Sequence, residues 1–133
     1  MKKLLVLVAI LYTGVLVGTA TQEREPWIVP EEERAVENPL TSSDDLIEEG
    51  AELYRKNCLM CHGETGKGDG PATARIKPAP PDLTPEAARE RMTDGEIFYK
   101  ITVGKRPMRG MERKLSEDQR WSLVIFVRSL QGD

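Results

Sequence analysis

Apolar residues recur at helical spacing in several separate stretches of this chain. The first stretch begins after Ser43 or Asp44, either of which can cap the first turn of a helix. Its small and apolar positions share one helical face: Leu46, Ile47, Gly50, Leu53 and Tyr54. This pattern predicts a helix that leads directly to Cys58.

Two further helices are predicted from their first turns. Thr84-Pro85 places a capping residue before a proline, so a short helix is expected over residues 85–91. Thr93-Asp94-Gly95-Glu96 has the form of a capping box and opens a helix to about Val103. Gly104 is the expected end of that helix.

A last helix is predicted at the C-terminus. Ser116-Glu117-Asp118-Gln119 is a second capping box, and the helix that it opens extends to about Leu130. The run from Leu123 to Val127 is too apolar for an exposed helix and must be mostly covered. No stretch alternates in the manner of a strand, so the predicted fold class is all-α. A length of 133 residues allows one domain plus appendages.

Residues 1–20 have the form of a targeting segment. Met1-Lys2-Lys3 is positively charged, the stretch from Leu4 to Ala20 is mostly apolar, and Gly18-Thr19-Ala20 supplies small residues at a cleavage position. The segment is either a cleaved signal peptide or an uncleaved N-terminal membrane anchor. Either alternative places the rest of the chain outside the cytoplasm, in the periplasm or on the extracytoplasmic face of the membrane.

Residues 21–41 are acidic and interrupted by prolines, which is typical of a linker. A short helix is expected near residues 31–37. Trp27, Ile28 and Val29 form the only apolar cluster, and Trp27 either packs on the domain or lies at a membrane interface. The compact domain is therefore expected to comprise residues 42–133.

Cys58-Leu59-Met60-Cys61-His62 is the attachment sequence of a c-type haem. Two thiols one helical turn apart can each add to a vinyl group of the porphyrin, and the adjacent imidazole reaches the iron from the same side. Both cysteines and the only histidine of the chain lie in these five consecutive residues. The chain therefore carries one haem c, and ligation by two of its own histidines is excluded.

Two other uses of a CxxC pair are disfavoured. A redox-active dithiol normally follows a strand, and no strand is predicted here. A structural zinc site takes four Cys or His ligands, whereas the chain has two cysteines and one histidine.

Charge is distributed unevenly although the net charge is only −3. Residues 23–49 are strongly acidic, and residues 100–114 are basic. A nucleic-acid partner is not expected, because the chain has no excess of positive charge and carries an export segment.

The domain resembles a class I cytochrome c, and the match is best to the small monohaem cytochromes of bacterial respiratory chains. The resemblance covers about residues 42–131 and depends on several motifs in order: Gly50-x-x-x-Tyr54, the haem motif followed by GKGDGP, Pro81-Asp82-Leu83, DGEIF at 94–98, a methionine loop, and LSEDQRWSLVIFVRSL at 115–130. It implies four to five helices around one covalent haem, with the N- and C-terminal helices of the domain crossing where Gly50 and Tyr54 meet Phe126.

The resemblance also implies roles for single residues. Cys58 and Cys61 would form the thioethers, and His62 would be the proximal iron ligand. The carbonyl of Pro81 would accept the Nδ1–H of His62, with Pro71 as the alternative acceptor.

The sixth ligand is expected to be Met108, because it follows Pro107 at the ligand position of the family. Met111 is the alternative, and an open or water-ligated site is a third. Arg109 replaces the proline that the family usually has after the methionine. Further residues are expected in the haem pocket or the core: Ile97, Phe98, Ile101 and Trp121.

These features predict a one-electron carrier of a bacterial respiratory or photosynthetic chain, not an enzyme, with redox proteins as partners. The alternative is a tethered haem c subunit of a membrane oxidoreductase complex, attached through the N-terminal segment. A catalytic or gas-sensing haem is disfavoured, because the chain has no second histidine to serve as a distal acid or base.

Overall fold

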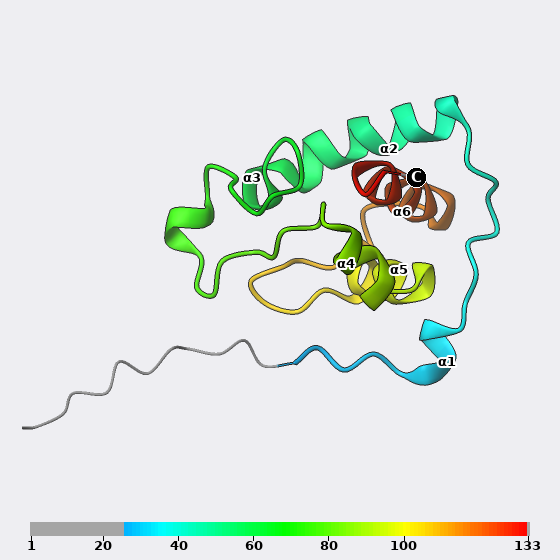
Figure 1. Ribbon diagram of the computed structural model, residues 1–133, viewed down its shortest axis with the longest axis horizontal. Helices are drawn as coiled ribbons and strands as arrows, with labels where there is room; N and C mark the ends of the chain where they lie inside the picture. Colours follow the sequence, from blue (N-terminus) through cyan, green and yellow to red (C-terminus); the bar gives the residue numbers. More distant parts are fainter. Residues whose placement is uncertain (1–25, 133) are drawn as a thin grey trace, which may run out of the picture.

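The computed structural model describes residues 26–132, and the long helices lie where their caps predict them (Figure 1). These are α2 (Asp44–Asn57), α5 (Asp94–Val103) and α6 (Glu117–Leu130). Each begins after a side-chain hydroxyl that accepts a hydrogen bond from a backbone N–H of its first turn: Ser43, Thr93 and Ser116. Only Ser116 heads a full capping box, because the Glu96 carboxylate pairs with Lys100 at 2.6 Å instead of turning back to Thr93.

Short helical segments connect the long ones. Within the described residues they are α1 (Glu31–Arg34), α3 (Leu59–His62), the 3₁₀ turn η1 (Thr73–Arg75) and α4 (Glu86–Arg91). The same residues contain no strand. The all-α fold class is confirmed. The described residues contain more helices than the four or five expected, because the number includes the single turns α1 and α3.

The contact between α2 and α6 is the most extensive helix packing in the described residues. Figure 1 shows α2 crossing over α6, which is seen nearly end-on. A Cβ atom on Gly50 would lie 2.3 Å from the Ser122 carbonyl oxygen and 2.7 Å from the Cβ of Phe126. Only glycine therefore permits this approach. The rings of Tyr54 and Phe126 pack beside it with centroids 5.0 Å apart.

The core lies between α6, α2 and α5. Its largest fully buried side chains are Trp121 and Tyr54, followed by Leu123 and Val124. Phe98 stacks on Trp121 with a centroid separation of 3.8 Å and an interplanar angle of 14°. This stack joins α5 to α6 and fixes which side of each helix faces the other.

The described part of the predicted linker packs on the domain. Val29 is only 7% exposed, and the Thr93 hydroxyl donates a 2.7 Å hydrogen bond to the Arg34 carbonyl. A Cβ on Gly95 would lie within 2.7 Å of two carbonyl oxygens of this segment, those of Glu33 and Val36. Residues 29–36 are therefore seated against α5, and the Asn38 side chain donates to the Trp121 carbonyl of α6. Composition alone did not indicate this because the contacts are made largely by backbone atoms.

The predicted targeting segment, residues 1–20, lies outside the described residues. Among residues 26–132, no helix has the length and apolar character to cross a bilayer.

Replacing Gly50 with alanine is expected to destabilise the protein by about 2–3 kcal/mol, because the new methyl group would overlap the α6 backbone. Chemical unfolding of the purified holoprotein measures this change. The matched control is Glu48→Ala on the exposed side of the same helix, which is expected to stay within about 0.5 kcal/mol. Equal stability of the two variants would contradict the close helix contact.

Candidate functional site: a haem attachment cavity

One cavity of about 720 Å³ connects the haem motif with the methionine loop. Its walls come from the end of α2, α3, residues 76–83, α5, the loop at 105–111 and one face of α6. Figure 1 shows α3 and the loop after α5 (yellow to orange) at the same end of the molecule. The volume lies in the range of protein sites that enclose a cofactor or small ligand.

Cys58, Cys61 and His62 all line this cavity because α3 is a single helical turn. The His62 N–H donates to the Cys58 carbonyl at 2.9 Å, which closes the turn. The following loop folds back on α3, with the Gly68 N–H donating to the His62 carbonyl at 2.8 Å. The two thiols and the imidazole are thus presented to one space, as the motif predicts.

Cys58 and Cys61 are not joined in a disulfide. The pKa of Cys58 is raised to about 12, mainly by burial and also by the neighbouring Cys61, against a smaller opposing effect of Lys114. A redox-active dithiol requires a lowered thiol pKa, so this environment argues against that chemistry. The described residues contain no group of three or more His, Cys, Asp or Glu side chains that could hold a zinc ion.

Tyr54 fixes the C-terminal end of α3 through a hydrogen bond. Its hydroxyl donates a 2.8 Å hydrogen bond to the Gly63 carbonyl, and its side chain also borders the cavity. Burial raises the pKa of this phenol well above its ordinary value, with smaller contributions from Cys58 and Asp69. The tyrosine therefore joins the α2–α6 contact to the haem motif.

Pro81 lines the cavity together with His62, whereas Pro71 does not. The segment carrying Pro81 is fixed at its end by Leu83. The Leu83 N–H donates to the Gly66 carbonyl at 2.8 Å, and the Leu83 carbonyl accepts from Nε2 of Gln131 at 2.8 Å.

A side-chain turn follows Pro81. The Asp82 carboxylate accepts hydrogen bonds from the backbone N–H and the hydroxyl of Thr84, and these bonds lower its pKa.

Both candidate methionines, Met108 and Met111, line the cavity. Ile97 and Ile101 line it as well, whereas Phe98 and Trp121 are not among its lining residues. These two aromatic side chains stack on each other in the core behind it. They were expected in either the pocket or the core, and the structure places them in the core.

Several lining residues were not singled out from the sequence as cavity residues. They are Pro26 and Trp27 from the N-terminal segment, Ile76 and Pro78 before Pro81, and Leu123 and Val127 from α6. The apolar run of α6 indicated burial but not which positions face the cavity. Nothing in the sequence indicated that Pro26 and Trp27 line the same cavity as the haem motif.

The charged side chains of the cavity wall have one sign. Apart from His62, the described lining residues with an ionisable nitrogen are Lys100, Lys105, Arg106 and Arg109, and no Asp or Glu is among them. All four come from α5 and the loop after it. Lys100 is paired with Glu96 behind the wall at 2.6 Å.

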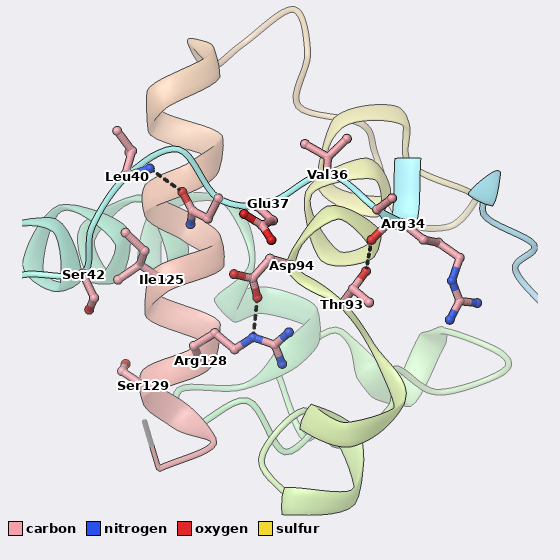
Figure 2. A pocket seen from close by; sticks show the side chains of 12 residues that line it. Arg34, Val36, Glu37, Leu40, Ser42, Thr93, Asp94, Ile125, Arg128 and Ser129 are labelled. Atoms are coloured by element: carbon pink, nitrogen blue, oxygen red, sulfur yellow. Dashed lines mark hydrogen bonds and ion pairs between the residues drawn. The ribbon is translucent and has the colours of Figure 1, made fainter. Parts of the chain in front are cut away.

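A second hollow lies on another side of the molecule, between residues 34–42 and α6 (Figure 2). Its lining contains no Cys, His or Met. Asp94 and Arg128 form a 2.7 Å ion pair within it, and the Thr93 hydroxyl donates to the Arg34 carbonyl, as the dashed lines in Figure 2 show. These residues join the N-terminal segment to the domain and offer no donor set for a haem.

The cavity residues fit a covalently held haem: two adjacent thiols, an imidazole, thioether sulfurs and apolar walls. The family model described as Cytochrome c matches residues 47–131. The chain belongs to the cytochrome c family. It carries one haem c, bonded through Cys58 and Cys61.

Relatives and solved structures agree with this assignment. The cytochrome bc1 complex cytochrome c subunit of Corynebacterium efficiens is 30% identical over 84 residues, which are 62% of this chain and 25% of that protein. The chain thus matches about a quarter of that relative's length. A structure of the reducing HAO-like protein complex of Kuenenia stuttgartiensis has a TM-score of 0.59 at 28% identity, covering 83% of this chain and 52% of that one.

A solved c-type cytochrome has a TM-score of 0.54 at 23% identity. The match covers 62% of this chain and 96% of that cytochrome. It supports the fold alone, and it agrees with the helical arrangement around the haem motif.

Tyr54→Phe is expected to cost about 1–3 kcal/mol at neutral pH, because the Gly63 carbonyl loses its buried donor. The raised pKa favours the neutral phenol in the folded state, so its contribution is complete below pH 10 and is lost as the pH rises further. The difference between wild type and variant should therefore shrink by up to about 1.4 kcal/mol per pH unit above pH 10. Denaturant unfolding at several pH values measures it, and a difference that stays constant through pH 11 would contradict this role.

Proposed function

We propose that this protein is a one-electron carrier whose haem iron is ligated by His62 and Met108. The observation that supports the proposal most strongly is a single cavity lined by both attachment cysteines, by His62 and by Met108. The haem supplies the redox chemistry, because its iron accepts and returns one electron. With a side chain on each side of the iron, no position remains for a substrate.

The chain's own residues hold and tune that group. Cys58 and Cys61 retain it covalently, and α3 fixes the position of His62. We assign the carbonyl of Pro81, which lines the cavity with His62, as the acceptor that would orient the imidazole through its Nδ1–H in the haem-bound protein. Ile97, Ile101 and the α6 face exclude water, which favours the less charged, reduced state of the iron.

Met108 is assigned as the sixth ligand in preference to Met111. The Met111 backbone is tied to α5 and to the segment before α6, because its N–H donates to the Ile101 carbonyl and its carbonyl accepts from the Leu115 N–H. Met108 lies in the turn of the same loop, where its N–H donates to the Lys105 carbonyl at 2.9 Å. The thioether of Met108 is thus carried by a turn that precedes the segment held by Met111.

Met108→Ala is expected to abolish the sulfur-to-iron charge-transfer band in the far red and to make carbon monoxide binding to the reduced protein fast and complete. Met111→Ala, the matched control in the same loop, should keep the band and bind carbon monoxide slowly. Optical spectra of both oxidation states measure this. Loss of the band in the Met111 variant alone would reassign the ligand, and fast carbon monoxide binding by the wild type would refute a closed site.

The basic side chains of the cavity wall support redox partners with an acidic docking surface. The proposed compartment is the periplasm or the extracytoplasmic face of the membrane. Arg106→Gln combined with Arg109→Gln should slow electron transfer to an acidic partner about tenfold at low salt, and the difference should vanish at high salt. Lys56→Gln on exposed α2 is the control. Stopped-flow rates that do not vary with ionic strength would remove electrostatic docking.

A second candidate is a tethered haem subunit of a membrane oxidoreductase complex. The similarity to the cytochrome bc1 complex subunit supports it, as does the apolar segment at residues 4–20. The mass of the mature protein separates the two candidates. A chain that begins near Thr21 supports a free carrier, and one that retains residues 1–20 supports a tethered subunit.

A further inference from the structure

The N-terminal segment at residues 26–36, called the strap below, lies outside the stretch matched by the family model. It is nevertheless seated firmly on α5. Val29 is buried, the Arg34 carbonyl accepts from Thr93, and Arg34 reaches the buried carboxylate of Glu96 at 3.8 Å. Figure 2 shows the contact between Arg34 and Thr93. Gly95 leaves the room that the strap backbone needs.

The far end of the strap borders the haem cavity. Pro26 and Trp27 line the same space as Cys58 and His62. The Lys105 ammonium group donates to the Pro26 carbonyl at 3.4 Å, and the Lys100 ammonium group lies 5.8 Å from the centroid of the Trp27 ring. Figure 1 shows the strap (blue) running alongside the loop after α5.

Trp27 is thus held beside the basic wall of the cavity. The basic side chains come from α5 and the loop after it, whereas the attachment cysteines come from the haem motif at α3. The two groups therefore belong to different walls of the cavity. A porphyrin bonded by its former vinyl groups has its two carboxylate groups on the other side of the ring. The Lys and Arg side chains of residues 100–109 carry the charge that such carboxylates require, and the strap contacts two of them, Lys100 through Trp27 and Lys105 through Pro26.

We propose that the strap is a cover for the carboxylate edge of the haem, with Trp27 as the residue that positions it and excludes water. The inference depends on the haem occupying the cavity as described above. Exclusion of water from the ring disfavours the oxidised iron, which carries the additional positive charge, and the neighbouring Lys side chains offset the carboxylates, so the strap raises the reduction potential and limits the access of small reagents. Both effects are added by residues outside the family match.

Trp27→Ala is the direct test, in the full-length holoprotein. At a fixed ambient potential the ratio of reduced to oxidised haem should fall about threefold, and the rate of reduction by ascorbate should rise about threefold. Trp27→Phe should retain most of both properties because it keeps an aromatic cover. Ile28→Ala is the matched control, since Ile28 is adjacent and 83% exposed.

A second variant releases the strap without altering the cavity wall. Arg34→Gln removes the link to Glu96 while Lys100 still neutralises that carboxylate. It should shift the potential and the ascorbate rate in the same direction as Trp27→Ala, to a smaller extent.

Wild-type potential and ascorbate rate in both Trp27→Ala and Arg34→Gln would overturn the proposal, and lower stability with both properties unchanged would reduce the strap to a structural role. The wild-type spectrum and the effect of Met108→Ala test the haem and its ligation separately. Failure of the cover therefore leaves the proposed function standing.

Discussion

The α2–α6 contact at Gly50 holds the position of every group that faces the haem cavity. Because no side chain separates the two backbones at this point, Tyr54 packs against Phe126 and reaches the Gly63 carbonyl with its hydroxyl. That hydrogen bond secures the end of α3, the turn that presents Cys58, Cys61 and His62. A larger residue at position 50 would separate α2 from α6 and move the haem motif away from the α6 wall.

The cavity combines an apolar interior with a basic wall, and the two serve different purposes. Ile97, Ile101, Leu123 and Val127 remove water from the space beside the attachment cysteines. The side chains of residues 100–109 bring positive charge to the same space, with one of them, Lys100, balanced by buried Glu96. In the proposed carrier, such a site would favour the reduced iron and would attract an acidic partner.

The strap shows how a segment outside the family's common domain can alter the site. It is attached to α5 through backbone carbonyls and through Arg34, and it ends with Pro26 and Trp27 at the cavity.

Much of the fold could be predicted from the sequence, because helix caps and apolar spacing act over one or two turns. Ser43, Thr93 and Ser116 marked the starts of α2, α5 and α6. The attachment motif could also be identified from the sequence, because two thiols and an imidazole within five residues lie close together on any single helical turn. Met108 and Pro81 were identified by resemblance, and the choice over their alternatives remains a prediction.

The sequence by itself determined the all-α class, the attachment cysteines and the only histidine available as a ligand. Only the tertiary structure decided that Phe98 and Trp121 belong to the core and that Trp27 lines the cavity. It also decided that residues 29–36 pack on α5. The physical reason is that these placements depend on contacts between residues far apart in the chain, several of them made by backbone carbonyls that carry no sequence signal.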